Sequence, residues 1–323
     1  GAFSDLATLT PRAGLIPYDL NAPFWSDAAL KSRWIAVPNN GTHNTAAEQV
    51  GFDARGGNWD FPAGTVTVKH FELGTDETDP SVTQRLETRF VVFTEDDFYA
   101  VTYKWNAEGT DAVLQTNRTE ETIAIETLDG SRDQVWTYPG RQDCLLCHTR
   151  ATGGGLGLRT HQLNRDFVYP GSGVQDNQLR TLSHLGIFGS ELQEANIPSL
   201  PKAAALTDES ASLDLRARSY LDSNCSHCHR ADASTRAVFD ARFETPLYAT
   251  DLLFGTVADE LDIAGAAVIQ PRETHRSVSL VRAASVGTIA MPPIAKSLVD
   301  EPGIEVLGDW IRNLSPSEHV RLG

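Results

Sequence analysis

The sequence predicts an α+β protein, with an antiparallel β-rich domain over residues 1–140, a middle segment over 141–204 and an all-α domain over 205–323. Three observations support this division. Runs of β-branched and aromatic residues fill the first part. A Cys-x-x-Cys-His motif occurs once in the middle segment and once in the last part. Apolar residues recur at helical spacing in the last part.

Three strand-like runs follow one another in the N-terminal part. Residues 66–73 come after a Pro-Ala-Gly turn signal, residues 86–93 end at acidic turn residues, and residues 98–105 come next. Short polar breaks between such runs are typical of hairpins. We therefore expect an antiparallel meander, continued by strands at 112–114 and 122–125.

Loop-forming residues bound the first motif in the middle segment. Pro139 and Gly140 precede it, and three consecutive glycines at 153–155 follow it. A helix is expected around residues 177–185. Residues 197–201 contain two prolines and are typical of a linker.

Two helices are expected in the C-terminal part. Apolar residues from Leu213 to Leu221 recur on one helical face, and this helix leads directly into Cys225. A second apolar stripe runs from Ile304 to Ile311, and Asp300 can cap its start.

The two motifs use all four cysteines of the 323-residue chain: Cys144, Cys147 and His148 in the first, and Cys225, Cys228 and His229 in the second. In Cys-x-x-Cys-His motifs the two thiols bind the haem covalently and the histidine is an axial iron ligand. The sequence therefore predicts two covalently attached haem c groups.

Other chemistries explain the pattern less well. Zinc sites with two Cys-x-x-Cys pairs usually have them about 15–20 residues apart, which is far closer than here. A thioredoxin-like redox pair explains neither the second copy nor the histidines. Disulfides within each motif would join cysteines that are too close in sequence to bridge readily.

The second haem has a clear candidate for its distal ligand. Met291 is the single methionine of the chain, and a Met-Pro step followed by a C-terminal helix resembles the methionine loop of class I cytochromes c. Histidine–methionine ligation raises the reduction potential. His275 is the alternative ligand, and a gap-filling role for Met291 in the core is the alternative function. His227, inside the motif, is expected to face outward.

The distal ligand of the first haem stays open at this point. His70, in a strand with half-buried alternation, is the leading candidate, and His184, on the expected helix after the motif, is the second. His43 and His161 are further candidates, and an open sixth position is the remaining alternative.

Several segments carry a resemblance that spans most of the chain. The segments are 17–27, 60–65, 102–106, 162–166 and 220–225. Together with the two motifs they resemble a bacterial family of exported di-haem, c-type cytochrome-like proteins, and the C-terminal part resembles a class I cytochrome c domain. The resemblance implies one di-haem unit outside the cytoplasm, periplasmic or secreted. Some relatives carry carbohydrate-binding modules, which suggests a link to polysaccharide degradation.

The leading functional hypothesis is electron transfer, from a bis-histidine haem 1 to the histidine–methionine haem 2 and on to a partner. The alternative enzyme is a di-haem peroxidase with an open site at haem 1, although the β-rich first half departs from the mostly helical pattern of such enzymes. A third hypothesis is a binding or sensing module, in which the β-rich part binds a glycan or a partner and the haems report the redox state.

Composition limits the partners. A net charge of −16 excludes a nucleic-acid-binding footprint and suits a basic redox partner. No apolar run reaches the length of about 20 residues that a membrane span needs. Residues 1–5 are not a signal peptide, so we expect a removed signal or a longer parent chain. The acidic stretch 76–79 offers oxygen ligands for calcium but matches no recognised loop.

Overall fold

The computed structural model describes residues 1–189, 192–231, 235–236, 238–294 and 296–315. By its internal contacts the chain forms two units. Unit 1 comprises Gly1–Leu20 and Ala28–Lys202, and unit 2 comprises Asn21–Asp27 and Ala203–Gly323. Each unit therefore contains one Cys-x-x-Cys-His motif. The boundary at Lys202 directly follows the proline-containing segment 197–201.

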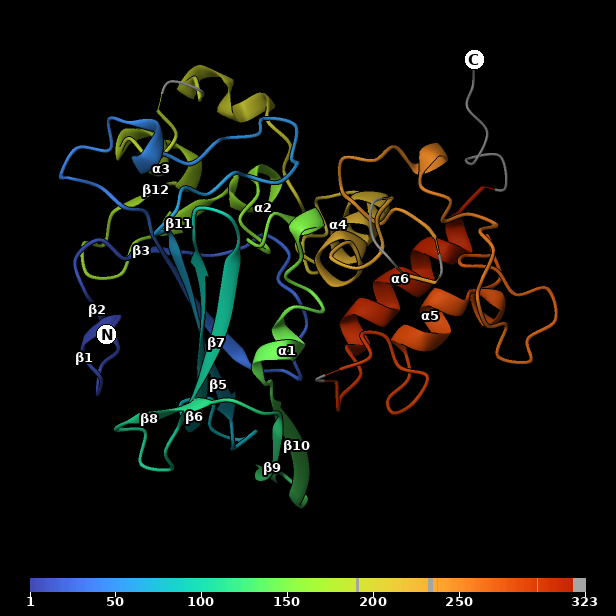
Figure 1. The fold of residues 1–323 in the computed structure, drawn as a ribbon. Coiled ribbons are helices and arrows are strands. Elements are labelled where there is room, and N and C mark those ends of the chain that lie inside the picture. The colour runs from blue at the N-terminus through green and yellow to red at the C-terminus, as the bar shows by residue number, and fades with distance from the viewer. Residues whose placement is uncertain (190–191, 232–234, 237, 295, 316–323) are drawn as a thin grey trace. The chain divides into compact units, whose positions relative to one another are not determined.

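Unit 1 is built around a six-stranded antiparallel sheet (Figure 1). The meander expected over residues 66–105 is present, and β8 extends it. Its strands lie in chain order: β3 (Ile16–Tyr18), β4 (Leu30–Ala36), β5 (Val66–Gly74), β6 (Thr83–Phe93), β7 (Phe98–Trp105) and β8 (Ala112–Gln115).

The strand expected at 122–125 does not continue this meander. It belongs to β9 (Thr119–Thr127), which pairs along its length with β10 (Gly130–Tyr138) in a separate hairpin. The reason is burial. Ile123 and Ile125 pack with Phe71 of β5 in one apolar cluster, so the hairpin lies over the sheet instead of adding to its edge. The indole of Trp136 donates a hydrogen bond to the buried carboxylate of Glu87, at 3.1 Å.

The remaining part of unit 1 packs around a second core that includes Trp59, Leu163 and Leu182. The helix expected near residues 177–185 is α3, and Asn177 caps it by accepting the Leu179 N–H at 3.0 Å. The other elements are β1 (Phe3–Asp5), β2 (Thr10–Pro11), α1 (Arg141–Cys144), α2 (Thr160–Leu163), β11 (Asp166–Val168), β12 (Gln175–Asn177), α3 (Gln178–His184) and the 3₁₀ turns η1 (Ala46–Glu48), η2 (Arg150–Thr152) and η3 (Glu194–Ser199).

Both helices expected in the C-terminal part are present in unit 2. Ser212 caps α4 (Leu213–Cys225), and Asp300 caps α6 (Glu301–Asn313). The two helices contact each other, as Figure 1 shows, and Leu221, Leu307 and Ile311 lie in their shared core. The shorter elements are η4 (Leu247–Ala249), η5 (Thr274–Arg276) and α5 (Val278–Ala283).

The expectation of an all-α, cytochrome c-like C-terminal domain is wrong. The fold is β-rich overall, and the described part of unit 2 contains no extended all-α domain. The described residues between α4 and α5 form irregular backbone, with turns, 3₁₀ segments and the isolated bridges Leu253–Ile269 and Ala267–Ser277. This stretch lacks the 3.6-residue apolar period that identified α4 and α6, so the two helices were extrapolated to a domain that the intervening residues do not form.

A short N-terminal segment, Asn21–Asp27, belongs to unit 2. The backbone N–H of Trp25 donates to Asn224 Oδ1 at 2.9 Å, and its indole donates to the carbonyl of Leu298. The buried carboxylate of Asp27 accepts the N–H groups of Ser297 and Leu298. The N-terminal segment thus fixes the chain just after Met291. Within the described residues, no helix is both long and apolar enough to span a membrane.

Candidate haem-attachment sites

The two Cys-x-x-Cys-His motifs share one backbone conformation. In each, a helix ends at the first cysteine, and the N–H of the histidine donates to that cysteine's carbonyl, at 2.9 Å for His148 and 2.8 Å for His229. The N–H of the second cysteine donates to the same carbonyl. Positions i, i+3 and i+4 of such a turn lie on one side. Both thiols and the imidazole of each motif can therefore face one ligand.

In unit 1 a backbone carbonyl fixes the ring of His148. Its Nδ1 lies 2.6 Å from the carbonyl oxygen of Gly154. Because a carbonyl only accepts, Nδ1 carries the proton, and the lone pair that can bind a metal is on Nε2. Gly154 has φ +72°, and a Cβ there would lie 2.6 Å from the ring of Phe98. Glycine at this position lets the loop approach the sheet closely enough to hold the histidine.

Cys144 packs against one face of the central sheet. Its neighbours Val91, Phe93 and Ala100 form an apolar cluster on β6 and β7. Burial raises the pKa of the Cys144 thiol above its ordinary value, and the nearby Arg89 guanidinium offsets part of this effect. With no metal bound, the thiol of Cys144 is therefore favoured over the thiolate. A neutral thioether sulfur suits the same environment.

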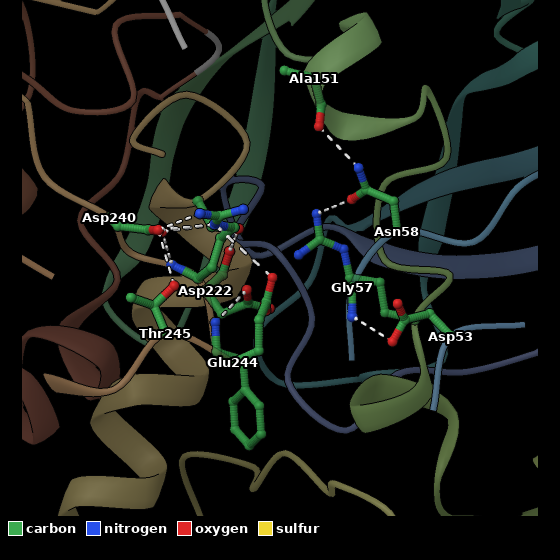
Figure 2. Close-up of polar contacts among 12 residues, drawn as sticks. Asp53, Gly57, Asn58, Ala151, Asp222, Asp240, Glu244 and Thr245 are labelled. Carbon is green, nitrogen blue, oxygen red and sulfur yellow. Dashed lines mark hydrogen bonds and ion pairs between the residues drawn. The ribbon is translucent and has the colours of Figure 1, made fainter. Parts of the chain in front are cut away.

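The loop after the first motif is fastened by Asn58. Figure 2 shows its amide donating to the carbonyl of Ala151, at 2.9 Å, and its carbonyl oxygen accepts from Arg159 of the α2 region, also at 2.9 Å. Asp53 accepts the N–H of Gly57 and closes the turn that presents Asn58. This network fixes the loop that follows His148.

The histidines considered for the first haem lie in different places. Register pairs Lys69 with Arg89, and Val91 with Ala100, on the face that Cys144 contacts. His70, one residue along β5, is on the opposite face, where its Nδ1 lies 2.8 Å from Thr88 Oγ1 and its ring contacts Trp105. The structure therefore does not bring His70 to Cys144.

None of the other candidate histidines belongs to a strand of the central sheet. His184 is exposed at the end of α3. His161 is fully buried in α2, beside Gly56. His43 lies in a loop next to Asn39. The acidic stretch that suggested calcium is a turn, in which Asp76 accepts from Thr78 and Asp79 accepts from Ser81.

In unit 2 the first cysteine of the motif packs against the α4–α6 core. Burial raises the pKa of the Cys225 thiol to about 12, with Cys228 and Asp222 adding to the effect. All four cysteines are free of disulfides. The neutral form of the Cys225 sulfur is therefore strongly favoured, which again fits a thioether better than a thiolate.

His229 is held from both its ring and its backbone. Its ring stacks on Phe239, with centroids 4.1 Å apart and planes 9° from parallel. Its carbonyl accepts the N–H of Ala241 at 2.9 Å. The segment that follows the motif therefore positions the second histidine, as the glycine loop positions the first.

A polar network fixes the segment that carries Phe239. Asp240 accepts from the Arg242 guanidinium and from the Thr245 hydroxyl, the latter at 2.9 Å, as Figure 2 shows for Asp240 and Thr245. Asp222, one turn before the motif in α4, accepts the N–H of Phe243 at 3.1 Å. Arg218 of α4 donates to the carbonyls of Arg242 and Thr245.

Met291 lies in a closed loop after α5. Its N–H donates to the carbonyl of Arg282 at 3.1 Å, and its own carbonyl accepts from Lys296 Nζ at 3.1 Å. Lys296 is also among the charged neighbours of Cys225, which links the methionine loop to the second motif. The residue is 38 % exposed, so it does not fill a gap in the core. His275, with a side chain 73 % exposed, lies beside Glu273.

Three features of these sites were missed or misjudged from sequence. His227 does not face outward: it is buried, and its ring contacts that of Phe24 edge-on at 5.5 Å. The stacking residue Phe239 had no signal, because no periodic element contains it. Gly154 was recognised only as part of a loop, although the glycine run was a sign of close backbone approach.

Comparisons with known proteins add no further constraint. No family model, curated protein or solved structure matches the chain. The interpretation therefore depends on the geometry of the two motifs.

Substituting Asp240→Asn should destabilise unit 2 by about 1–3 kcal/mol at pH 7, because a buried, charge-assisted network is weakened. Burial alone raises the pKa of Asp240, but hydrogen bonds from Arg242 and Thr245 outweigh it and hold the pKa below 3.8. The ionised form thus stabilises the folded state above the ordinary carboxyl pKa, and this contribution is lost as pH falls through the lowered folded value.

Urea unfolding at pH 7 and near pH 3 measures both effects. The difference between the original protein and Asp240→Asn should shrink at the lower pH. Asp309→Asn, which removes an exposed partner of Arg312 on α6, is the matched control and should change stability by no more than about 0.5 kcal/mol. Equal effects of the two substitutions would show that the Asp240 network does not stabilise the fold.

Proposed function

We propose that the chain is a di-haem c-type cytochrome that transfers electrons outside the cytoplasm, with one haem c attached in each unit. The observation that carries the proposal is the shared conformation of the two motifs. Helices of different length, in different units, both end at a cysteine and continue into the same hydrogen-bonded turn. Chance placement of cysteines would not produce the same three-residue arrangement twice.

The surroundings of the motifs support the same chemistry. The two first cysteines lie against apolar clusters, and their raised pKa values disfavour the free thiolate that thiol exchange would need. His148 has the tautomer that presents Nε2 to a metal. When bound, each haem would supply one-electron chemistry, while the protein sets its ligands, burial and hydrogen bonding.

Different distal ligands would set the direction of electron flow. Met291 is proposed as the distal ligand in unit 2, and methionine raises the potential of a haem. Unit 1 has no methionine, because the chain contains a single one. Electrons would enter at haem 1 and leave from haem 2. The net charge of −16 would steer a basic redox partner to the surface, by an attraction that weakens with salt.

A peroxidase activity at haem 1 is the second candidate function. The observation in its favour is the position of the leading histidine candidate: His70 is on the sheet face opposite Cys144. A haem at the first motif would then not have His70 as its sixth ligand. An open iron can bind peroxide, whereas a bis-histidine iron cannot without losing a ligand.

Replacing both cysteines of one motif by serine should remove one haem and leave the other. Cys144→Ser with Cys147→Ser should lose the haem of unit 1, and Cys225→Ser with Cys228→Ser should lose that of unit 2. Intact mass and iron content under denaturing conditions give the number of haems. Leu146→Ala, inside the first motif and exposed, keeps both thiols and should retain two haems. A protein that carries no covalent haem in any form would refute the proposal.

Met291→Ala should lower the reduction potential of one haem and create a high-spin fraction, because the strong-field sulfur ligand is lost. Met291→His should keep that iron low-spin and still lower its potential. Potentiometric titration and low-temperature EPR measure both quantities. His275→Ala is the control and should change neither. If Met291→Ala leaves both potentials unchanged, Met291 is not the ligand.

EPR of the intact ferric protein also separates electron transfer from peroxidase activity. Two low-spin signals that persist in His70→Ala and His184→Ala would exclude those residues as ligands. A high-spin signal retained by Cys225→Ser with Cys228→Ser, together with peroxide turnover, would assign the open iron to unit 1. Low-spin iron throughout and no turnover would leave electron transfer as the function.

A further inference from the structure

A row of cations crosses the central sheet in unit 1. Arg33 of β4 lies directly opposite Lys69 of β5, and Lys69 lies directly opposite Arg89 of β6. Lys31 is one step along β4 on the same face, opposite Phe71. Like charges directly opposite each other on neighbouring strands are destabilising. This group of four neighbouring cations stands out in a chain with 27 basic and 43 acidic residues.

The local carboxylates offset part of this charge. Asp19 forms ion pairs with Arg33 and with Arg165, and Glu87 binds Arg89 through both of its oxygens. Positive charge still dominates around Lys69. Burial, followed by Arg33, Lys31 and Arg89, holds the pKa of Lys69 well below its ordinary value, and Glu87 acts in the opposite direction as a smaller effect.

The side chains of the row are directed by packing. Lys69 Nζ lies 5.0 Å, and the Arg89 guanidinium 4.4 Å, from the ring centroid of the buried Phe71. Lys69 and Arg89 are both half-buried, and 28 % of the Arg89 side chain is exposed. They are thus held in place while part of each remains accessible to a ligand.

The same sheet face changes from apolar to cationic along its strands. Cys144 packs on Val91, Phe93 and Ala100 at the apolar end, and Arg89 is two residues from Val91 along β6. Strand β6 lies between β5, which carries Lys69, and β7, so Lys69 is about 10 Å from β7 across the sheet. A haem has an apolar edge with the vinyl groups, which join the cysteines, and an opposite edge with two propionate carboxylates. The sheet face likewise has an apolar end, at Cys144, followed by a cationic end, which suits the propionate edge of a haem.

We propose that Lys69, with Arg89 and Lys31, binds the propionates of the haem attached at Cys144 and Cys147. The proposal rests on the function proposed above, because it needs a haem at the first motif. Cations placed beside a propionate would form charge-assisted hydrogen bonds with it. This binding would also orient the haem over the sheet face that Cys144 contacts.

Lys69→Met in the full, haem-loaded protein tests this assignment. Loss of a cation beside a propionate favours the ferric state, so the reduction potential of haem 1 should fall. A tenfold change in the ferric-to-ferrous ratio corresponds to about 59 mV for one electron. Lys69→Arg should keep the potential, and Lys31→Met should lower it in the same direction. Haem 2 should be unaffected in all three.

Lys104→Met is the matched control. Lys104 lies on the same sheet face in β7, but it pairs with Glu121 and lies over the Tyr138 ring, so its loss should leave haem 1 unchanged. An unchanged potential in both Lys69→Met and Lys31→Met, with two haems still attached, would overturn the inference and leave the cytochrome proposal intact. Absence of haem from the original protein's first motif would instead refute the cytochrome proposal.

A soluble oxyanion is the other source of negative charge. Titrating sulfate against chloride at constant ionic strength tests it in the original protein. If the potential of haem 1 changes with saturation, and Lys69→Met abolishes the change, the row binds free anions and the propionate assignment is wrong. A potential that is the same in both salts supports the assignment.

Discussion

The two-residue alternation of the central sheet controls most of unit 1. Successive side chains of β5 point to opposite faces, so Lys69 and Phe71 share the face that Cys144 contacts, while His70 lies on the other. The β9–β10 hairpin buries Phe71 on that face, and Gly154, which lies close to Phe98 at the start of β7, hydrogen-bonds His148. A shift of one residue in the register of β5 would exchange all of these contacts.

In unit 2, hydrogen bonds to side chains, and not strand pairing, position the residues around the motif. Hydrogen bonds accepted by buried carboxylates take the place of a sheet. Asp27 fixes the chain after Met291, and Asp240 fixes the segment that stacks on His229. This difference explains how two identical motifs can have unlike surroundings. The conformation of each motif is set by hydrogen bonds within the motif itself. The residue that could serve as the further ligand of each site would come from a different segment in each unit.

Local sequence patterns predicted the parts of the fold that have a regular period. The strands of the meander and the helices α3, α4 and α6 follow from alternation, apolar stripes and caps. The pattern could not show that Ile123 and Ile125 lie over the sheet, because stacking and edge addition use the same alternation. The irregular stretch between α4 and α5 has no period at all, and so its filling with helices was an extrapolation. The motif residues were identifiable because their spacing is itself the signal.

For His70, the predicted strand is present, but the residue does not lie on the face where a distal ligand of the first haem would be needed. The strand containing it was predicted, and its burial fits the alternation. Which face the first motif would contact depends on the packing of α1 on β7, and no local pattern encodes that choice. Cys144 packs on the sheet face that carries Lys69. Residues on that face, and not those around His70, can therefore contact a group bound at the first motif. The net charge of the chain is −16, so any steering of a basic redox partner would come from the excess of acidic groups and not from this row of cations. Under these proposals, the basic groups around Lys69 would bind the cofactor, and the excess of acidic groups would attract a basic partner.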